Sequence, residues 1–407
     1  MGRTVAAIIA IFLCTTCAWF ILAASINIRS NESDSTLGPK VSSTWGAPQT
    51  QTPPTASVVS RMVESLVVDH ATNTNRTVTE PELAYLPIER SRIDVGLDLD
   101  QRQKGLLWFA TYRVDFHGDY IFRNNTPKDE VTINLAFPAA NAIYDNLMLR
   151  VDGQPAPLTT INGGVSTIVH RPSGAPFRVE IGYRSQGQST WSYSFGSGVA
   201  QVRDFEMQMR TNFKAIDFAQ GTLSPTNKKE TGGGWLLTWK YTNVVTGYGI
   251  GMVMPEKLQP GPLAGRISCF APVSLLFFFF VMFIIATLRR IALHPMHYFF
   301  LATSFFAFHL LLAYLVDHIS IHLAFVICSA VSIFLVVSYL RVVVNPQFAF
   351  REAAFAQFVY LVLFSYAFFF KGFTGLAITT GAIANLFVAM QATARVNWRS
   401  DVVNSAA

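Results

Sequence analysis

The sequence predicts a membrane protein with a bundle of six transmembrane α-helices and a large inserted all-β, sandwich-like domain. Two observations lead to this fold class. Long apolar runs stand at both ends of the 407-residue chain, and a region of alternating polar and apolar residues lies between them. Each apolar run is close to the roughly 20 residues that a helix needs to cross the hydrocarbon layer. Helix is the only state that pairs every backbone group of an isolated span.

The first apolar run covers residues 5–24, and we assign residues 1–25 to an N-terminal transmembrane signal anchor. A cleavable signal peptide has a shorter apolar stretch of about 7 to 15 residues. The length therefore favours a retained helix. The small residues Ala23, Ala24 and Ser25 keep cleavage open as the alternative.

The other five apolar runs form a predicted transmembrane bundle over residues 267–392. They cover residues 267–288, 298–316, 323–344, 353–370 and 373–392. None of them has the polar face that a core helix of a soluble domain would show. A tail at residues 393–407 follows and is predicted to be cytoplasmic.

The charge distribution predicts the orientation of these spans. The formal net charge is +6, yet residues 25–266 are balanced, with 23 Lys and Arg against 22 Asp and Glu. The excess positive charge lies in the short flanks of the spans, where it marks the cytoplasmic side. Both termini are therefore predicted to be cytoplasmic and residues 25–266 to be exported, and Lys371 alone lies on the unexpected side. Because the charge is topological, a nucleic-acid partner is excluded and the lipid bilayer is expected.

Residues 26–88 are predicted to form a polar linker or a loose segment, because Ser, Thr, Pro and Asn dominate them. Such a composition buries too little apolar surface to order itself independently. Residues 58–68 are the exception, and they fit either a short helix or a strand.

Residues 89–262 are predicted to form the sandwich-like β-domain. Ile93, Val95 and Leu97 alternate with polar residues, which is typical of a half-buried strand. Eight or nine such strands are expected, separated by turns. Because no long amphipathic helix lies between them, an antiparallel sandwich is predicted. The predicted strands after the first are residues 106–116, 120–122, 131–137, 147–151, 177–183, 202–209, 236–241 and 250–254. The predicted turns are at residues 117–119, 124–127, 152–153, 162–164 and 232–234.

The chemistry of the chain favours no enzyme class. All four cysteines lie in the apolar runs, so the β-domain has no disulfide, and the pair Cys14 and Cys17 has no second pair for zinc. The exported histidines His70, His117 and His170 have no metal-ligand spacing. Neither a G-x-S-x-G nor an H-E-x-x-H motif is present. We predict no catalytic residue, metal or cofactor.

Five residues of the membrane block are candidates for a function. Ionisable residues inside a membrane are costly and are functional candidates by default, and His309 lies deepest. A neutral His309 that hydrogen-bonds a neighbouring helix is the favoured alternative to a transport site. Asp317, His318 and His322 have the side chains of a weak external metal or pH sensor, although a hydrated capping loop is favoured. Asn385 ends a stripe with Ala377 and Gly381, which predicts tight helix packing.

Trp191 and Tyr193 are the candidate residues of the β-domain. They lie in the aromatic segment at residues 187–197, which could form a platform for a sugar or a peptide. Packing inside a hairpin is the commoner fate of aromatic residues on strands.

Three segments resemble the CreD family of bacterial inner-membrane proteins. They are Trp45-Gly46 with Gln49, residues 293–298 (LHPMHY) running on to Asp317-His318-Ile319, and the closing Arg395-Val396-Asn397-Trp398. The order of an N-terminal helix, an exported β-rich domain and a helix bundle is also similar. Pro53-Pro54 and Asn397 depart from the family pattern, which indicates a divergent member. The resemblance implies residence in the inner membrane and a part in envelope integrity or stress, and it brings no catalytic residues.

The predicted function is therefore a non-enzymatic protein of the inner membrane whose periplasmic β-domain, within residues 25–266, binds an unknown envelope protein or ligand. A homo-oligomer stays open as a further partner. The alternative function is a transporter, or a subunit of one, that uses the C-terminal helix bundle with His309 and Asn385.

Overall fold

The computed structural model describes residues 2–69, 74–104, 107–196, 198–370, 372 and 374–394. The predictions for His70, Lys371 and the closing motif at 395–398 lie outside these residues. The chain divides into two compact units, which confirms the predicted fold class of a helix bundle with a β-domain. The helical unit comprises Met1–Ser35, Gly105–Leu107 and Leu258–Ala407, and the β-unit comprises Thr36–Lys104 and Trp108–Lys257.

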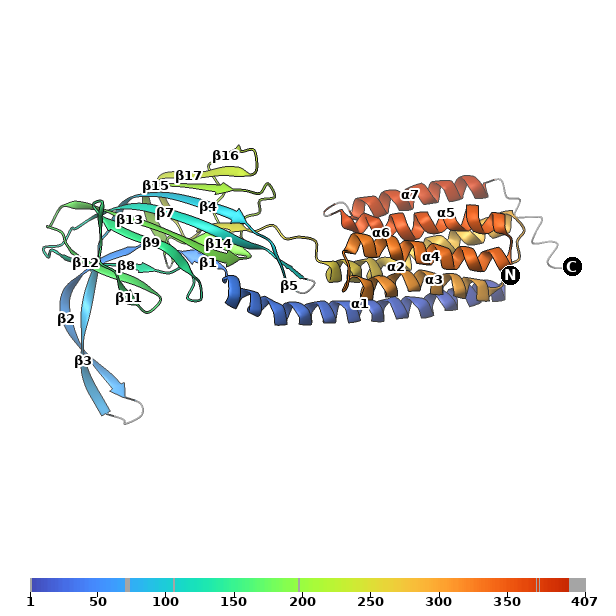
Figure 1. The fold of residues 1–407 in the computed structure, drawn as a ribbon, viewed down its shortest axis with the longest axis horizontal. Coiled ribbons are helices and arrows are strands. Elements are labelled where there is room, and N and C mark those ends of the chain that lie inside the picture. The colour runs from blue at the N-terminus through green and yellow to red at the C-terminus, as the bar shows by residue number, and fades with distance from the viewer. Residues whose placement is uncertain are drawn as a thin grey trace. The chain divides into compact units, whose positions relative to one another are not determined.

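The helices lie where apolar runs occur in the sequence (Figure 1). They are α1 (Gly2–Trp45), α2 (Pro260–Leu288), α3 (Pro295–Leu315), α4 (Ile321–Val343), a composite helix from Phe348 to Phe369, and α7 (Thr374–Thr393). The composite helix consists of π segments η1 (Phe348–Ala353) and η2 (Phe358–Leu363), α segments α5 (Ala354–Gln357) and α6 (Phe364–Tyr366), and the 3-10 turn η3 (Ala367–Phe369).

Five of these helices are long and apolar enough to cross a membrane, counted over the described residues. They are α1, α2, α3, α4 and the composite helix. The sixth predicted span is also a helix, α7, but its apolar part from Thr374 to Phe387 is shorter than the other spans. The helices share one core in which Leu275, Phe278, Leu301 and Phe305 are fully buried.

The β-unit contains four sheets. The eight-stranded sheet has the order β10-β9-β13-β7-β4-β15-β17-β16, the five-stranded sheet β11-β12-β8-β2-β3, and the smaller sheets β1-β14-β18 and β5-β6. The strands are β1 (Gln49–Gln51), β2 (Thr55–Asp69), β3 (Thr74–Tyr85), β4 (Ile88–Leu99), β5 (Arg102–Lys104), β6 (Leu107–Phe109), β7 (Thr111–Arg123), β8 (Glu130–Ala136), β9 (Tyr144–Val151), β10 (Gln154–Pro155), β11 (Thr159–Ile161), β12 (Gly164–His170), β13 (Pro176–Gln188), β14 (Thr190–Tyr193), β15 (Ala200–Thr211), β16 (Asn227–Glu230), β17 (Trp235–Thr246) and β18 (Ile250–Val253).

One hydrophobic core joins the larger sheets. Ile93, Val95 and Leu97 of β4 are buried, as their alternation predicts, and they share the core with Val131 and Ile133 of the five-stranded sheet. A strand places successive side chains on opposite faces. Each sheet therefore gives one apolar face to this core, as in a sandwich.

The prediction of a polar linker over residues 26–88 is wrong. Helix α1 continues to Trp45, and β1, β2 and β3 follow it. Extending an existing helix is much easier than nucleating one, so a polar stretch can continue an apolar helix. Strand β2 is ordered by pairing with β8, which lies about 70 residues later in the chain, because cross-strand contacts override weak local preference.

Two predictions inside the β-domain are also wrong. Residues 117–119 are not a turn, because they pair with β4 and β13 in the middle of β7, and residues 120–122 belong to that same strand. The Tyr120 ring lies 2.7 Å from the place where a Cβ on Gly118 would be, so the glycine makes room for an aromatic ring. The sheets are not wholly antiparallel either, because β4 pairs with β15, and β1 with β14, in parallel.

The residues Trp45, Gly46 and Gln49 form the end of α1 and the start of the first strand. The Arg102 guanidinium lies 3.3 Å from the centre of the Trp45 ring, and the Gly46 amide donates to Ser42 O at 3.0 Å. Gln49 is buried, and its Nε2 donates to Ser185 Oγ and Gln186 O, each at 2.8 Å. These residues therefore have a structural role.

A two-stranded ribbon projects from the five-stranded sheet. Strand β2 pairs with β8 only at residues 55–57, whereas its pairing with β3 continues to Asp69 and Thr74. Figure 1 shows β2 and β3 extending together beyond the other strands. Beyond residue 57 of β2, neither outer edge of the ribbon has a strand partner among the described residues.

Candidate functional site

His309 lies inside the helical unit and is bonded to its own helix. Its side chain is 1% exposed, and its Nδ1 donates to Phe305 O at 2.9 Å. Trp19 of α1 meets the imidazole edge-on, with ring centroids 5.7 Å apart. The prediction that His309 hydrogen-bonds a neighbouring helix is therefore wrong, because the acceptor is Phe305 O of the same helix. The Nε2 atom has no partner among the described residues.

Hydrogen bonds of polar side chains connect five helices of the helical unit, namely α2, α3, α4, the composite helix and α7. Gln357 is fully buried between the π segments η1 and η2, and its Nε2 donates to Ser332 Oγ at 2.7 Å. Ser332 in turn donates to Ser304 O at 2.6 Å. The Tyr360 hydroxyl donates to Asn385, and the Ser274 hydroxyl donates to Tyr360 O. Both sets of hydrogen bonds start from the composite helix, whose π segments are of a kind that often occurs at functional sites.

Asn385 joins α7 to the composite helix through the hydrogen bond from Tyr360. Gly381, in the same predicted stripe of small residues, does not pack against another helix. No atom lies within 4 Å of the position that a Cβ on Gly381 would take. The prediction of tight helix packing is therefore wrong at Gly381. The contact between α7 and the composite helix is made by the hydrogen bond from Tyr360 to Asn385. The side chain of Ala377 lies outside the described part of the chain.

Asp317, His318 and His322 are not brought together. Asp317 forms an ion pair with Arg29 of α1 at 3.1 Å, whereas His322 lies against the Phe369 ring at 5.3 Å between centroids. His318 is exposed. Within the described residues no group of three potential metal ligands occurs. The sensor arrangement of these three residues is therefore not formed.

Arg29 instead links α1 to the C-terminal end of α3. Besides the ion pair, its guanidinium donates to Ala313 O and lies 5.1 Å from the centre of the Tyr314 ring. A cation near the last carbonyls of a helix is favourable because of the helix dipole. Arg29 is therefore a positioning residue for the first helix.

We expect Arg29→Gln and Asp317→Asn to lower the free energy of unfolding non-additively. A half-exposed ion pair of this kind contributes about 0.5–1 kcal/mol, and a double-mutant cycle in mixed detergent micelles measures it. Arg341→Gln is the control, because Arg341 is exposed near the end of α4. Additive effects of the two substitutions would show that the ion pair does not stabilise the protein.

Trp191 and Tyr193 lie inside the β-unit and do not form a surface platform. Their side chains are 0% and 1% exposed, and the Tyr193 and Tyr120 hydroxyls lie 3.3 Å apart. Burial raises the pKa of Tyr193 well above its usual value, so the phenol is neutral at physiological pH. Trp191 packs in the core, whereas Tyr193 also lines a cavity.

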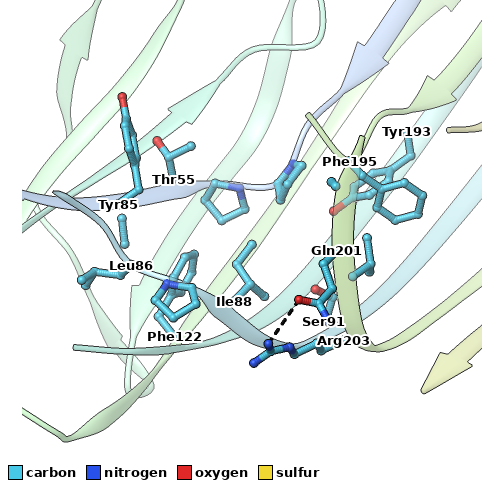
Figure 2. A pocket seen from close by; sticks show the side chains of 16 residues that line it. Thr55, Tyr85, Leu86, Ile88, Ser91, Phe122, Tyr193, Phe195, Gln201 and Arg203 are labelled. Atoms are coloured by element: carbon cyan, nitrogen blue, oxygen red, sulfur yellow. Dashed lines mark hydrogen bonds between the residues drawn. The ribbon is translucent and has the colours of Figure 1, made fainter. Parts of the chain in front are cut away.

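This cavity has a volume of about 420 Å³ and lies where β4 and β15 separate. Figure 2 shows Phe122, Ile88, Tyr193 and Phe195 around it, with Tyr85 at one side and Gln201 and Arg203 at the other. The complete lining consists of residues 53–56, 85–88 and 200–203 together with Ser91, Phe122, Tyr193 and Phe195. We call it the fork cavity. Apolar walls with a few polar groups are typical of ligand sites.

The fork cavity could not be found from the sequence, except for Tyr193. Its lining comes from distant segments, and two of these, residues 53–56 and 85–87, lie in the stretch predicted as a linker. The Pro53-Pro54 pair and Pro87 were the only local signal, because proline interrupts strand pairing.

Comparison with known protein families identifies the helical unit. Residues 262–399 match the family described as inner membrane protein CreD. This part of the chain is similar to the inner-membrane CreD family. The match lies over α2 to α7 and leaves the β-unit unmatched, so the CreD likeness concerns the helices and says nothing about the fork cavity.

Solved structures add little to the CreD assignment. A putative nutrient binding protein from Legionella pneumophila is 8% identical, with a TM-score of 0.33, and the alignment covers 57% of this chain and 76% of that one. An M1 zinc metallopeptidase from Deinococcus radiodurans is 12% identical, with a TM-score of 0.27 and coverage of 41% and 42%. Leukotriene A4 hydrolase from Saccharomyces cerevisiae is 10% identical, with a TM-score of 0.24 and coverage of 41% and 29%.

The chain thus spans less than half the length of these two enzymes. At such low identities and TM-scores, none of the three likenesses carries an argument about function. No curated protein matches the chain.

Proposed function

We propose that this CreD-like protein serves the integrity or stress response of the bacterial envelope by binding an envelope component in the fork cavity. In this proposal the β-unit is periplasmic and both termini are cytoplasmic, as the distribution of Lys and Arg favours. The observation that carries the proposal is the cavity itself, which has an apolar floor at Phe122 and a polar side at Gln201 and Arg203.

Binding without catalysis is the activity that this lining supports. General acid–base catalysis needs a carboxylate, histidine or comparable group beside the reacting atoms. The residues that line the fork cavity include no Asp, Glu, His, Cys or Lys. The Tyr193 phenol is buried and its pKa is raised, which makes it a poor base.

Transport is not proposed. A proton or ion path through a bundle is usually built from several ionisable groups that face one another. His309 instead faces the rings of Trp19 and Phe308 and bonds a carbonyl of its own helix. The polar network of Gln357, Ser332 and Ser304 contains no ionisable side chain, so it serves helix packing.

Filling the fork cavity is expected to abolish the function. We expect Ala200→Trp to prevent photocrosslinking from a benzoylphenylalanine at Tyr85, which lies at the rim and is 65% exposed. Cells with this variant should become as sensitive to detergent and bile salts as cells that lack the protein. The measurement combines adduct formation in living cells with growth under these stresses.

Two controls accompany this experiment. Val245→Trp places the same ring at an exposed position outside the cavity lining, and it should leave both readouts unchanged. A crosslinker at Ile168, which is 57% exposed on β12, reports adducts that do not depend on the cavity. Equal adducts at Tyr85 and Ile168, or normal growth with Ala200→Trp, would contradict the proposed function.

A further inference from the structure

The fork cavity lies between two strand edges that have no partner. Strands β4 and β15 pair in parallel from Ser91 and Phe205 to Leu97 and Thr211. Before this point β15 pairs only with β17, at residues 200–203, and β4 pairs only with β7, at residues 88–90. Each segment therefore has one open edge inside an eight-stranded sheet. Among the described residues, no backbone hydrogen bond closes these edges.

Arg92 lies at the point where the pairing between β4 and β15 begins. Its Nη1 donates to Asp204 O and its Nη2 to Asp204 Oδ1, each at 2.6 Å. Asp204 has a φ of 40°, in the left-handed region, and the ladder between β15 and β17 skips it. Aspartate tolerates this conformation better than most residues. The Arg92 side chain therefore stabilises the residue at which β15 leaves β4, and it keeps the two strands apart.

Three prolines in the lining of the fork cavity disfavour its closure by the protein's own chain. Pro53 and Pro54 precede β2, and Pro87 precedes β4. Proline has no amide hydrogen and cannot donate to a neighbouring strand. These three prolines thus cannot donate a backbone hydrogen bond to the open edges. Unpaired edge groups hydrogen-bond either to water or to an added strand.

We infer that the fork cavity binds an extended peptide segment of a partner protein, which adds a strand to the open edge of β15. This inference rests on the proposed function and names its ligand class. Added strands gain affinity from main-chain hydrogen bonds and specificity from pockets for alternate side chains. Here an apolar side chain of the peptide enters the cavity above Phe122 and Phe195.

The charge at the rim favours an acidic residue in the same peptide. Arg203 donates to Gln201 Oε1 at 3.2 Å, and in the described part of the protein it has no carboxylate within ion-pair distance. The nearby Glu89 carboxylate is bound by Arg123 through two hydrogen bonds of 2.6 and 3.1 Å. Arg203, which forms no ion pair among the described residues, can therefore pair with a carboxylate on the bound segment.

The first step of the test identifies the chemical class of the occupant. A benzoylphenylalanine replaces Gln201 in the full-length protein in cells, and the adduct is treated with protease, lipase or muramidase. We expect an adduct that only protease shortens, and mass spectrometry then gives the crosslinked segment. An adduct that lipase or muramidase removes would overturn the peptide inference but leave the proposed function intact. Absence of any adduct at Gln201 and Tyr85 would remove both.

The second step tests strand addition itself. The crosslinked segment is synthesised as a ten-residue peptide, and its binding to the purified full-length protein is measured by fluorescence anisotropy. Amide hydrogens of a strand point alternately to its two sides. One peptide is therefore N-methylated at its odd positions and another at its even positions. The set whose amides face β15 should lower the affinity about tenfold, and the other set should hardly change it. Equal affinities for the two N-methylated peptides would overturn the inference.

The third step tests the acidic residue. Arg203→Gln should weaken binding about threefold to tenfold, because a charge-assisted hydrogen bond is lost. Arg184→Gln is the matched control, since Arg184 is an exposed arginine on β13 of the same sheet and pairs with Asp115. An equal loss for both variants would show a general charge effect in place of the specific contact.

Discussion

Replacing Trp191 with alanine is expected to lower the free energy of unfolding of the β-unit by about 3–5 kcal/mol, the usual cost of removing a fully buried aromatic side chain. Trp191 is 0% exposed and packs against Phe116, with ring centroids 6.4 Å apart. Its Nε1 has no hydrogen-bond partner among the described atoms, so Trp191→Phe should cost much less. Hydrogen exchange at β14 in the full-length protein in detergent measures both effects.

The control for Trp191 is an aromatic residue at the surface. Tyr248 is 60% exposed, and Tyr248→Ala should change the free energy of unfolding by less than about 0.5 kcal/mol. If Trp191→Ala instead abolished ligand binding without loss of stability, the side chain would belong to a binding surface, and its place in the core would be refuted.

Replacing Gly46 with alanine is expected to cost about 3 kcal/mol or more, because two effects combine there. The residue has a φ of 137°, and an added Cβ would lie 2.1 Å from Gln186 O. Alanine can neither adopt this φ without strain nor fit its Cβ beside Gln186 O. The thermal midpoint of the purified protein reports the loss, and failure to accumulate in the membrane is the extreme form of the same result.

Gly38 provides the matched control for Gly46. It lies within α1, and an added Cβ would meet no atom within 4 Å. Gly38→Ala should therefore be neutral or stabilise the protein by up to about 1 kcal/mol, because alanine favours helix. If both glycine variants lost the same stability, the close contact at Gly46 would not be the cause.

The helices were predictable because hydropathy alone decides them. An apolar run of sufficient length has no alternative to helix in a membrane, and α2, α3 and α4 lie over the predicted runs. The core strands were predictable for a similar reason, since a half-buried strand must alternate. Ile93, Val95 and Leu97 show this alternation in the sequence and are buried in the structure.

Other parts depend on partners that are far away in the sequence. The strand at β2 has no strong local pattern and is ordered by β3 and β8. At Gly118 a glycine that resembles a turn signal makes room for the ring of Tyr120. Local composition therefore leaves residues 58–68 of β2 open between a helix and a strand, and it wrongly predicts a turn at residues 117–119.

Among the candidate sites, too, local signals could be predicted and contacts between distant residues could not. His309 could be found because a buried ionisable residue is conspicuous in an apolar helix, but its partner Phe305 could not be chosen over a neighbouring helix. Arg29 and Asp317 are 288 positions apart, and nothing in the sequence joins them. The fork cavity arises where two parallel strands separate, which is a property of sheet topology and not of any one segment.

The projecting ribbon of β2 and β3 has a consequence for self-association. Two free edges on a long hairpin invite uncontrolled growth of sheets between molecules. The part near its base carries the usual protections, namely Pro81 opposite Met62, an irregularity in register between Val59 and Arg61, and the charged pair Arg61 and Glu82. Such features disfavour edge-to-edge pairing with another strand. The base of the ribbon is thereby protected against aggregation through its edges.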